Sequence, residues 1–256
     1  MKVVILAGGL GTRLSEETVN IPKPMVEIGG MPILWHIMKI YSFYGLNEFI
    51  ICCGYKGYLI KKFFLDYYKF KSDFEINLKN NEIKYYKNPL ENWKVSLLDT
   101  GLNAPTGERI LKLKDILKSD ENFYLTYGDG LANVDIKKLT KNHFSQNKIC
   151  TMTAVPKPGR FGSIKIKKNK TLSFQEKPEL TDEVINGGFF LLNNKIFKYL
   201  KKKTSFESYT LQKLAKKNQI NINPHNKFWM PMDTLRDKNQ LEELWKSKKA
   251  PWKIWP

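Results

Sequence analysis

Cysteine is scarce in this sequence: there are three among 256 residues, and two of them, Cys52 and Cys53, are adjacent within an apolar run. This spacing supplies neither a disulfide framework nor a cysteine-based metal site. We therefore expect all three cysteines to be reduced residues of the core.

Long apolar runs are also missing. No run approaches the ~18 apolar residues of a membrane span, and the chain starts on a predicted strand rather than on a cationic leader. We expect a cytosolic, cytoplasmic protein without a membrane partner. There is likewise no internal repeat, low-complexity linker or clear boundary, and a chain with 42% hydrophobic residues can bury a full core. The sequence predicts a single domain over residues 1–256.

Acidic residues are few: the chain has 25 Asp and Glu and 43 Lys and Arg, which gives a net charge of +18. Such a charge raises the hypothesis of a nucleic-acid-binding protein. The lysines are nevertheless spread over several short runs instead of one stripe interleaved with aromatic residues, which favours solvated faces and long-range steering of small anions. These runs are 61–62, 167–168, 201–203 and 248–249.

Only four arginines occur: Arg13, Arg109, Arg160 and Arg236. The planar guanidinium grips phosphate or carboxylate at two points, which a lysine cannot copy. In a lysine-rich chain we expect the arginines to stand where geometry matters, either on a ligand or on a protein carboxylate.

A glycine-rich loop directly follows the first apolar strand. Val3-Val4-Ile5-Leu6 runs into Ala7-Gly8-Gly9-Leu10-Gly11-Thr12-Arg13-Leu14, so bare backbone N–H groups lie at the carboxyl end of a strand, where an anion can approach. Two familiar motifs do not fit. A dinucleotide fingerprint would need glycine at position 14, and a P-loop would need Gly-Lys-Ser/Thr at its end. The alternative is a tight strand-to-helix turn without a ligand.

Lys23 follows this loop and lies between Pro22 and Pro24. Each proline has a fixed φ, and the residue before a proline is pushed toward an extended conformation. A lysine on so stiff a segment indicates a placed ammonium group.

Strands and helices alternate through residue 155, which predicts an α/β fold with a doubly wound, mostly parallel, Rossmann-like sheet flanked by helices. We expect strands at 49–53, 76–87, 95–98 and 123–127, and helices at 32–44 and 58–70. Shorter strands after Thr151 predict a smaller β extension of the same sheet, at 151–155, 161–166, 172–176 and 185–192. Helices are then expected at 194–202, 207–217 and 234–248. Ligands of such sheets lie beyond the carboxyl strand ends, where the glycine-rich loop and Asp129 both fall.

The segments L-A-G-G-L-G-T-R-L from Leu6 and P-K-P from Pro22 together resemble the signature of the sugar-phosphate nucleotidyltransferases. These enzymes join a nucleoside triphosphate to a sugar 1-phosphate and release pyrophosphate. Further segments in the family's order are similar to members that use CTP and glucose 1-phosphate: V-E-I-G-G from Val26, C-C-G-Y-K-G-Y from Cys52, T-Y-G-D-G from Thr126, P-G-R-F-G from Pro158, F-Q-E-K-P from Phe174, I-N-G-G-F-F from Ile185, P-M-D-T-L-R-D-K from Pro231 and A-P-W-K from Ala250.

The resemblance implies a reaction, a division of the domain and an assembly. The product would be CDP-glucose, for bacterial surface polysaccharide such as the O-antigen of lipopolysaccharide. Residues 1–150 would mainly bind the nucleotide, and residues 151–256 mainly the sugar phosphate. Together with the aromatic tail Trp252-Lys253-Ile254-Trp255, the resemblance also implies a homo-oligomer, with a hexamer as the size that the family suggests.

Nucleotidyl transfer is catalysed mainly by positioning and electrostatics. The phosphate of a sugar 1-phosphate, with a second pKa of about 6, is already an anionic nucleophile near pH 7, so no general base is needed. Mg²⁺ on oxygen ligands would bridge the phosphates. Asp129, between two glycines at a strand end, is the leading metal ligand, with a plain glycine turn as the alternative. The resemblance adds Asp233, whose position alone favours an N-cap of the final helix.

The remaining site residues are implied by the resemblance. The catalytic residues would be Arg13 on the β and γ phosphates, Lys23 near the reacting centre and Lys177 on the sugar phosphate. The nucleotide-binding residues would be Leu6, Ala7, Gly8, Gly9, Leu10, Gly11, Thr12, Arg13, Lys23, Thr106, Gly107, Arg109 and Gly128. The sugar-phosphate-binding residues would be Glu176, Lys177, Asn186, Gly187 and Gly188. From the residues alone, Glu176 and Lys177 also fit an exposed ion pair.

Base selection is the point at which the chain departs from the family pattern. Cytosine needs a donor facing N3 and an acceptor for its amine, and uracil reverses that pair. The family's T-G-G-R reads here as Thr106-Gly107-Glu108-Arg109. A positive φ at position 108 would strain Glu108, and an inward carboxylate would repel a triphosphate. The alternatives are therefore UTP, dTTP or another hexose phosphate, and outside this class a nucleic-acid-binding protein or a non-catalytic sugar-nucleotide sensor.

Overall fold

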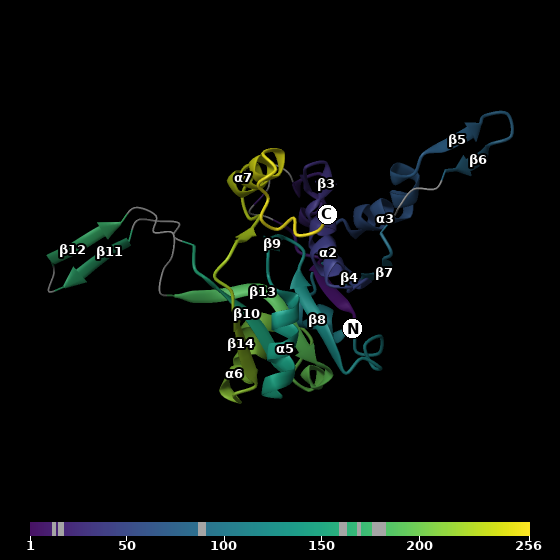
Figure 1. Cartoon of the computed structure of the whole chain (residues 1–256). Coiled ribbons are helices and arrows are strands. Elements are labelled where there is room, and N and C mark those ends of the chain that lie inside the picture. Colours follow the sequence, from purple (N-terminus) through teal and green to yellow (C-terminus); the bar gives the residue numbers. More distant parts are fainter. Residues whose placement is uncertain (12–13, 15–17, 87–90, 159–162, 168–169, 176–182) are drawn as a thin grey trace.

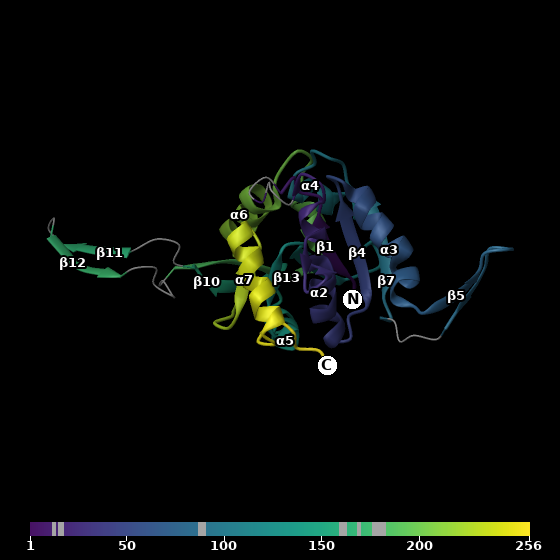
Figure 2. The same ribbon diagram turned by 90° about the horizontal axis from the view of Figure 1, so that it is seen from above.

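The computed structural model of the chain describes residues 1–11, 14, 18–86, 91–158, 163–167, 170–175 and 183–256. A seven-stranded sheet lies at its centre, with helices on both faces (Figures 1 and 2). In spatial order its strands are β14 (Ile220–Pro224), β10 (Cys150–Pro156), β13 (Val184–Asn193), β8 (Asn122–Tyr127), β1 (Val3–Ala7), β4 (Glu48–Cys53) and β7 (Lys94–Asp99).

The sheet is mostly parallel, as predicted. β8, β1, β4 and β7 run parallel to one another, and β10 is parallel to β14. β13 is antiparallel to both of its neighbours. The helices are α2 (Ile33–Phe43), α3 (Gly57–Lys71), α4 (Thr106–Leu111), α5 (Ile136–Gln146), α6 (Gln212–Lys216) and α7 (Leu235–Lys246). The segments predicted as helices at 194–202 and 207–217 begin instead as a 3-10 helix, η3 (Asn194–Lys198), and a π-helix, η4 (Phe206–Leu211).

Two β-hairpins project from opposite ends of the sheet (Figure 1). One consists of β5 (Phe74–Asn77) and β6 (Glu82–Tyr85), and the other of β11 (Ser163–Lys167) and β12 (Lys170–Gln175). The prediction that the strands at 161–166 and 172–176 extend the main sheet is wrong, because among the described residues they pair only with each other. Four short strands complete the fold: β2 (Glu27–Ile28), β3 (Met31–Pro32), β9 (Gly130–Ala132) and β15 (Trp229–Pro231).

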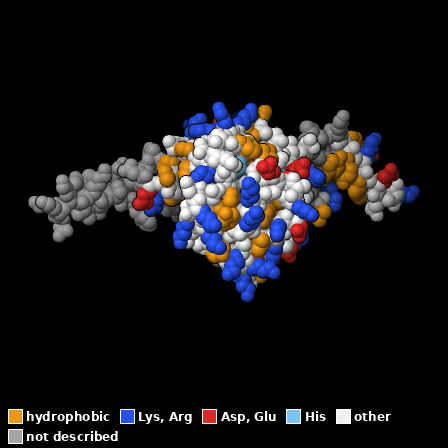
Figure 3. Space-filling view, turned by 90° about the horizontal axis from the view of Figure 1, so that it is seen from below, with side chains coloured by type: hydrophobic (Ala, Val, Ile, Leu, Met, Phe, Trp, Pro, Cys, Tyr) orange, Lys and Arg blue, Asp and Glu red, His pale blue; other side chains and the backbone are white. Residues whose placement is uncertain are grey.

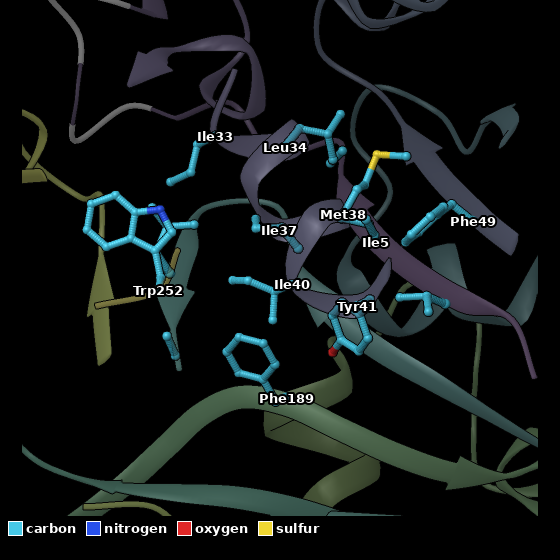
Figure 4. Packing of buried hydrophobic residues seen from close by; sticks show 14 of the residues in the cluster. Ile5, Ile33, Leu34, Ile37, Met38, Ile40, Tyr41, Phe49, Phe189 and Trp252 are labelled. Carbon is cyan, nitrogen blue, oxygen red and sulfur yellow. The ribbon is translucent and has the colours of Figure 1, made fainter. Parts of the chain in front are cut away.

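The core lies on both faces of the sheet, and every residue of the central strand β1 is therefore buried. Val3, Ile5 and Ala7 point into one cluster with α2, and Val4 and Leu6 point into the other with η4 and α6. Figure 4 shows the first cluster, in which apolar residues of α2 face Phe189 and the C-terminal Trp252. Alternation of side chains along a strand thus gives one strand two buried faces.

The three cysteines are free and buried, as expected. Burial raises the pKa of Cys52 to about 12, so this thiol stays protonated. Lysines at 62, 201–203 and 248–249 are exposed, as expected for solvated faces, and Figure 3 shows lysine and arginine side chains spread over one face without a continuous stripe. Among the described helices, none is both long and apolar enough to cross a membrane.

His36 on α2 is fully buried under the C-terminal aromatic residues. Its Nε2 lies 2.8 Å from the Ile28 carbonyl oxygen, and the Trp252 indole N–H donates to its Nδ1 at 3.4 Å. An Nδ1 that accepts and an Nε2 that donates belong to the neutral ring. Burial accordingly lowers the pKa of His36 to about 4.

We expect the fold to lose stability as the pH falls from about 6.5 to about 4. In this window the unfolded chain binds a proton that folded His36 does not, so His36 alone lowers the free energy of unfolding by about 3 kcal/mol. Urea titrations at pH 7.5, 5.5 and 4.5 measure this decrease, and His36→Gln should make it shallower. Equal slopes in the wild type and the variant would exclude His36 as the source.

Candidate active site

The glycine-rich loop and Asp129 meet at the carboxyl edge of the sheet. β1 lies between β8 and β4, with Leu6 beside Tyr127 and Ala7 beside Cys53. A pocket of about 340 Å³ opens beyond these strand ends, within the range of small-molecule sites. It is lined by Leu6, Ala7, Gly8, Gly9, Gly11, Lys23, Pro24, Ala104, Pro105, Thr106, Arg109, Tyr127, Gly128 and Asp129.

Arg109 forms one wall of the pocket and is 4% exposed. Its guanidinium donates to the Gly8 carbonyl (2.9 Å), the Cys53 carbonyl (3.2 Å), the Leu102 carbonyl (3.1 Å) and Thr100 Oγ1 (2.7 Å). These partners are carbonyl and hydroxyl oxygens, and none is a carboxylate, which was one of the two kinds of partner expected. Arg109 ties the glycine-rich loop to the ends of neighbouring strands.

Gly8 must be a glycine because of this arginine. A Cβ at position 8 would lie 2.1 Å from the Arg109 Nη1 atom, and Gly54 is equally constrained at 2.6 Å. Gly11 has a φ of +68°, which disfavours a side chain. Leu10, by contrast, is exposed and does not line the pocket.

Lys23 is 8% exposed and joins two carboxylates. Its Nζ lies 2.7 Å from Asp129 Oδ2 and 2.8 Å from Asp233 Oδ1. The expectation of an extended segment is wrong, because Lys23 begins a single 3-10 turn, η2 (Lys23–Met25), closed by the bond from Val26 N–H to the Lys23 carbonyl. The turn places the ammonium against Asp129 and Asp233, which follow Lys23 by 106 and 210 positions in the sequence.

Asp233 reaches the site through two short strands. β15 pairs antiparallel with β9, with Pro231 beside Gly130, and the Met232 N–H donates to the Asp129 carbonyl at 2.8 Å. The prediction that Asp233 favours the N-cap of the last helix is wrong. Thr234 is the N-cap of α7 and forms a capping box with Asp237, and the Asp233 carboxylate contacts Lys23 instead of capping the helix.

The donor set suits a hard divalent cation. The Asp129 and Asp233 carboxylates contact the same ammonium, and Mg²⁺ is usually held by one or two carboxylates with substrate phosphates and water as further ligands. Among the described residues there is no group of three or more His, Cys, Asp or Glu arranged for a metal. A metal here would therefore need oxygen ligands from the substrates.

Thr106 and Gly107 connect α4 to η4. The Phe206 N–H donates to Thr106 Oγ1 at 2.8 Å, and a Cβ on Gly107 would lie 2.7 Å from the Thr204 carbonyl oxygen. Thr106 also lines the pocket, whereas Gly107 does not. Both residues thus have structural partners beside the pocket.

Glu108 is neither strained by a positive φ nor directed into the pocket, the two possibilities raised by the sequence. It lies in α4 and is not among the described residues with positive φ. Its Oε2 accepts the Lys203 N–H at 2.7 Å, and Oε1 lies 3.9 Å from Lys112 Nζ. The carboxylate therefore does not line the pocket.

Glu207 and Tyr127 are site residues that the sequence reasoning missed. The Tyr127 hydroxyl donates to Glu207 Oε1 at 2.6 Å, and Thr106 and Ser205 each donate to Oε2 at 2.6 Å. Burial alone would raise the pKa of Glu207, but these hydrogen bonds outweigh burial and hold the pKa below its usual value. Burial and the neighbouring Glu207 raise the pKa of Tyr127. The network is thus an ionised carboxylate held by neutral hydroxyls.

Asn186, Gly187 and Gly188 on β13 lie next to this network. Asn186 Nδ2 donates to the Tyr127 hydroxyl at 3.2 Å, and Asn186 Oδ1 accepts the Gly188 N–H at 2.8 Å. Gly188 has a φ of +80°, and a Cβ there would lie 2.8 Å from the Tyr127 ring. The Trp229 indole donates to the Gly187 carbonyl at 2.7 Å. The two glycines are required by packing against β10 and Tyr127.

Several predicted residues lie outside the described part of the chain: Thr12, Arg13, Arg160, Glu176 and Lys177. Arg236 is exposed on the first turn of α7. The structure therefore brings together the loop at 6–11 with Lys23, Arg109, Asp129 and Asp233.

Comparison with known proteins agrees with this arrangement. Residues 2–245 match the family model of nucleotidyl transferases. A glucose-1-phosphate cytidylyltransferase from Salmonella typhimurium is 50% identical over 256 residues, 100% of both chains. A D-glycero-alpha-D-manno-heptose 1-phosphate guanylyltransferase from Campylobacter jejuni is 32% identical over 223 residues, 85% of this chain and 87% of that relative. The crystal structure of HddC from Yersinia pseudotuberculosis matches with a TM-score of 0.67 and 28% identity, over 95% of this chain and 99% of the other.

Proposed function

The chain belongs to the nucleotidyl transferase family, and from this premise we propose that it transfers the cytidylyl group of CTP to glucose 1-phosphate. The products are CDP-glucose and pyrophosphate, and we propose bacterial surface polysaccharide, such as the O-antigen, as the destination of CDP-glucose. The observation that carries the proposal is the contact of Lys23 with both Asp129 and Asp233 at the edge of the glycine-rich pocket.

Each described residue has a role that follows from its position. Backbone N–H groups of the loop at 8–11 receive phosphate oxygens, and Arg109 keeps the loop in shape through the Gly8 carbonyl. The Lys23 ammonium stabilises charge on the phosphates near the reacting centre. An oxygen of glucose 1-phosphate attacks the α-phosphorus of CTP, and the bond to the pyrophosphate oxygen breaks, so no protein base takes a proton.

Family members generally use a divalent metal ion, and we propose Mg²⁺ held by Asp129 and Asp233. When bound, Mg²⁺ would neutralise the charge that develops on the phosphates. Arg13, Lys177 and Glu176 keep the roles that the resemblance gives them: the first on the β and γ phosphates, the second on the sugar phosphate and the third on sugar hydroxyls. Residues 1–150 are thereby assigned mainly to the nucleotide and residues 151–256 mainly to the sugar phosphate.

CTP is favoured over other nucleotides by two observations. Identity is 50% to the cytidylyltransferase and 32% to the guanylyltransferase, and the departure at Glu108 does not face the pocket. Pyrophosphate release with glucose 1-phosphate and CTP, UTP, dTTP, ATP or GTP tests this choice. Release with CTP alone is expected. Release with UTP or dTTP would overturn the base assignment, and polynucleotide binding without release would favour the nucleic-acid alternative.

We also propose a homo-oligomer. The β5–β6 hairpin exposes Phe74, Ile76, Leu78 and Ile83, and an isolated two-stranded hairpin is at best marginally stable in water. A second copy that covers this surface would bury it. Light scattering coupled to gel filtration should give a multiple of the chain mass, six for a hexamer, and Ile76→Asp with Ile83→Asp should reduce it. A wild-type monomer at micromolar concentration would contradict the proposal.

The proposed location is the cytoplasm. Its supply of CTP provides the substrate, and the three buried thiols are stable in its reducing conditions.

A further inference from the structure

Glu207 is a carboxylate that the steps above do not use; it lies next to the pocket and accepts hydrogen bonds from two of the lining residues, Thr106 and Tyr127. It lies in the first turn of η4, where Ser205 is the N-cap. Its two oxygens accept three hydroxyl hydrogen bonds, from Tyr127, Thr106 and Ser205, each of 2.6 Å. Within the described part of the chain, no lysine or arginine forms an ion pair with it. An anion beside a pocket for phosphates is costly unless its acceptor character is needed.

The carboxylate fixes the direction of the hydrogen bond that Tyr127 makes with it. An ionised carboxylate can only accept, so the Tyr127 hydroxyl must donate to Glu207. The Tyr127 oxygen is then left to accept from Asn186 Nδ2. The Gly188 N–H, which can only donate, holds Asn186 Oδ1 on the other side of the amide. Glu207 thus keeps the Tyr127 oxygen in the acceptor role that the Asn186 amide needs.

This chain of hydrogen bonds connects both halves of the site. Thr106 and Tyr127 line the pocket, whereas Asn186 and Gly188 belong to the segment assigned to the hexose. The Tyr127 ring also packs directly on Gly188. A change at Glu207 would reach the sugar half through Tyr127, and it would reach Thr106 through a bond that the Phe206 N–H also supports.

We propose that Glu207 is a positioning residue for the sugar half of the site: by accepting the Tyr127 proton it keeps the Tyr127 oxygen as the acceptor that anchors the Asn186 amide in place for the hexose. This inference rests on the proposed function. Glutamine at position 207 would place an N–H₂ donor against one of three hydroxyl donors. The hydroxyl that must turn is the Tyr127 hydroxyl, since Ser205 and Thr106 share the other oxygen.

Steady-state kinetics of Glu207→Gln, Tyr127→Phe and the double variant test the proposal, with glucose 1-phosphate and CTP varied in turn. We expect Glu207→Gln to raise the KM for glucose 1-phosphate about tenfold and the KM for CTP less than about twofold, as for the loss of one oriented hydrogen bond. In the Tyr127→Phe background Glu207→Gln should raise the KM for glucose 1-phosphate less than about twofold further, because the hydrogen bond through Tyr127 is already absent. Glu121→Gln is the matched control, since Glu121 is exposed at the opposite end of β8.

Equal increases in both KM values, or additive effects in the double variant, would overturn the proposal and leave Glu207 a support for the fold. If Glu207→Gln does not fold, Asn186→Asp replaces the donor to Tyr127 and should raise the KM for glucose 1-phosphate alone. An inactive wild type would reject the proposed function. In that case calorimetric titration with glucose 1-phosphate tests the inference on Glu207 separately. About tenfold weaker binding to Glu207→Gln supports the inference, whereas equal binding, or no binding to the wild type, overturns it.

Discussion

Asp129→Asn is expected to lower Mg²⁺-dependent pyrophosphate release by about a thousandfold. The substitution removes one of two carboxylates at the proposed metal position, and a metal ion stabilises transferring phosphates by several kcal/mol, with about 1.4 kcal/mol for each factor of ten. It also removes one of the two negative charges that contact the Lys23 ammonium. The measurement is the initial rate of pyrophosphate release with CTP and glucose 1-phosphate over a range of Mg²⁺ concentrations.

Asp120→Asn is the matched control for this experiment. Asp120 also pairs with a lysine, Lys2, but it precedes β8 at the end opposite to Asp129. Its substitution should change the rate less than about twofold. If Asp129→Asn keeps more than a tenth of the activity with an unchanged Mg²⁺ requirement, Asp129 does not hold the metal.

The sequence predicted the part of the site that strand order alone determines. An apolar strand followed by glycines, and a second apolar strand followed by Asp129, must end at one edge if both belong to a parallel sheet. The flanking prolines indicated Lys23 as a placed ammonium group, but its 3-10 turn was not foreseen. The local rule for a residue before proline yielded to two turn hydrogen bonds, from Met25 and Val26.

Asp233 and Glu207 show what local patterns do not contain. The position of Asp233 follows from a three-residue pairing of β9 with β15, and strands so short leave almost no periodic signal. Its sequence neighbours favoured a cap, because Asp and Thr are both good N-caps and only the structure chooses Thr234. Glu207 is connected to the pocket through the hydroxyls of Tyr127 and Thr106, which lie 80 and 101 positions away in the sequence.

Arginine scarcity was informative in a limited way. It pointed to Arg109 as a residue whose geometry matters, and Arg109 is indeed buried with four oxygen partners. It did not indicate that most of these partners are backbone carbonyls, because carbonyls carry no signal in the sequence. The pairing of β11 with β12 was missed for a similar reason, since a sequence pattern predicts a strand but does not show which strand pairs with it.

Lys23→Met is expected to have two separable effects. Catalysis should fall by about two to three orders of magnitude, as for the loss of one group that stabilises transition-state charge. Stability should change in a way that depends on Mg²⁺. In the wild type one ammonium contacts both Asp129 and Asp233, and without it two carboxylates face each other and repel. The variant should therefore melt at a lower temperature than the wild type when Mg²⁺ is absent.

Mg²⁺ should then stabilise Lys23→Met more than it stabilises the wild type. In the wild type the Lys23 ammonium contacts one oxygen of each carboxylate, so the ion must compete with it. The variant removes this competitor, and an ion that binds the folded state raises the melting temperature. Thermal melts with and without Mg²⁺, in the absence of nucleotide, measure the difference, with Lys2→Met as the control at the other end of the sheet. An equal Mg²⁺ shift in Lys23→Met and the wild type would mean that the ion binds elsewhere, even if catalysis is lost. A larger shift in the variant would instead support Asp129 and Asp233 as the carboxylates that bind the ion, since Lys23 contacts both.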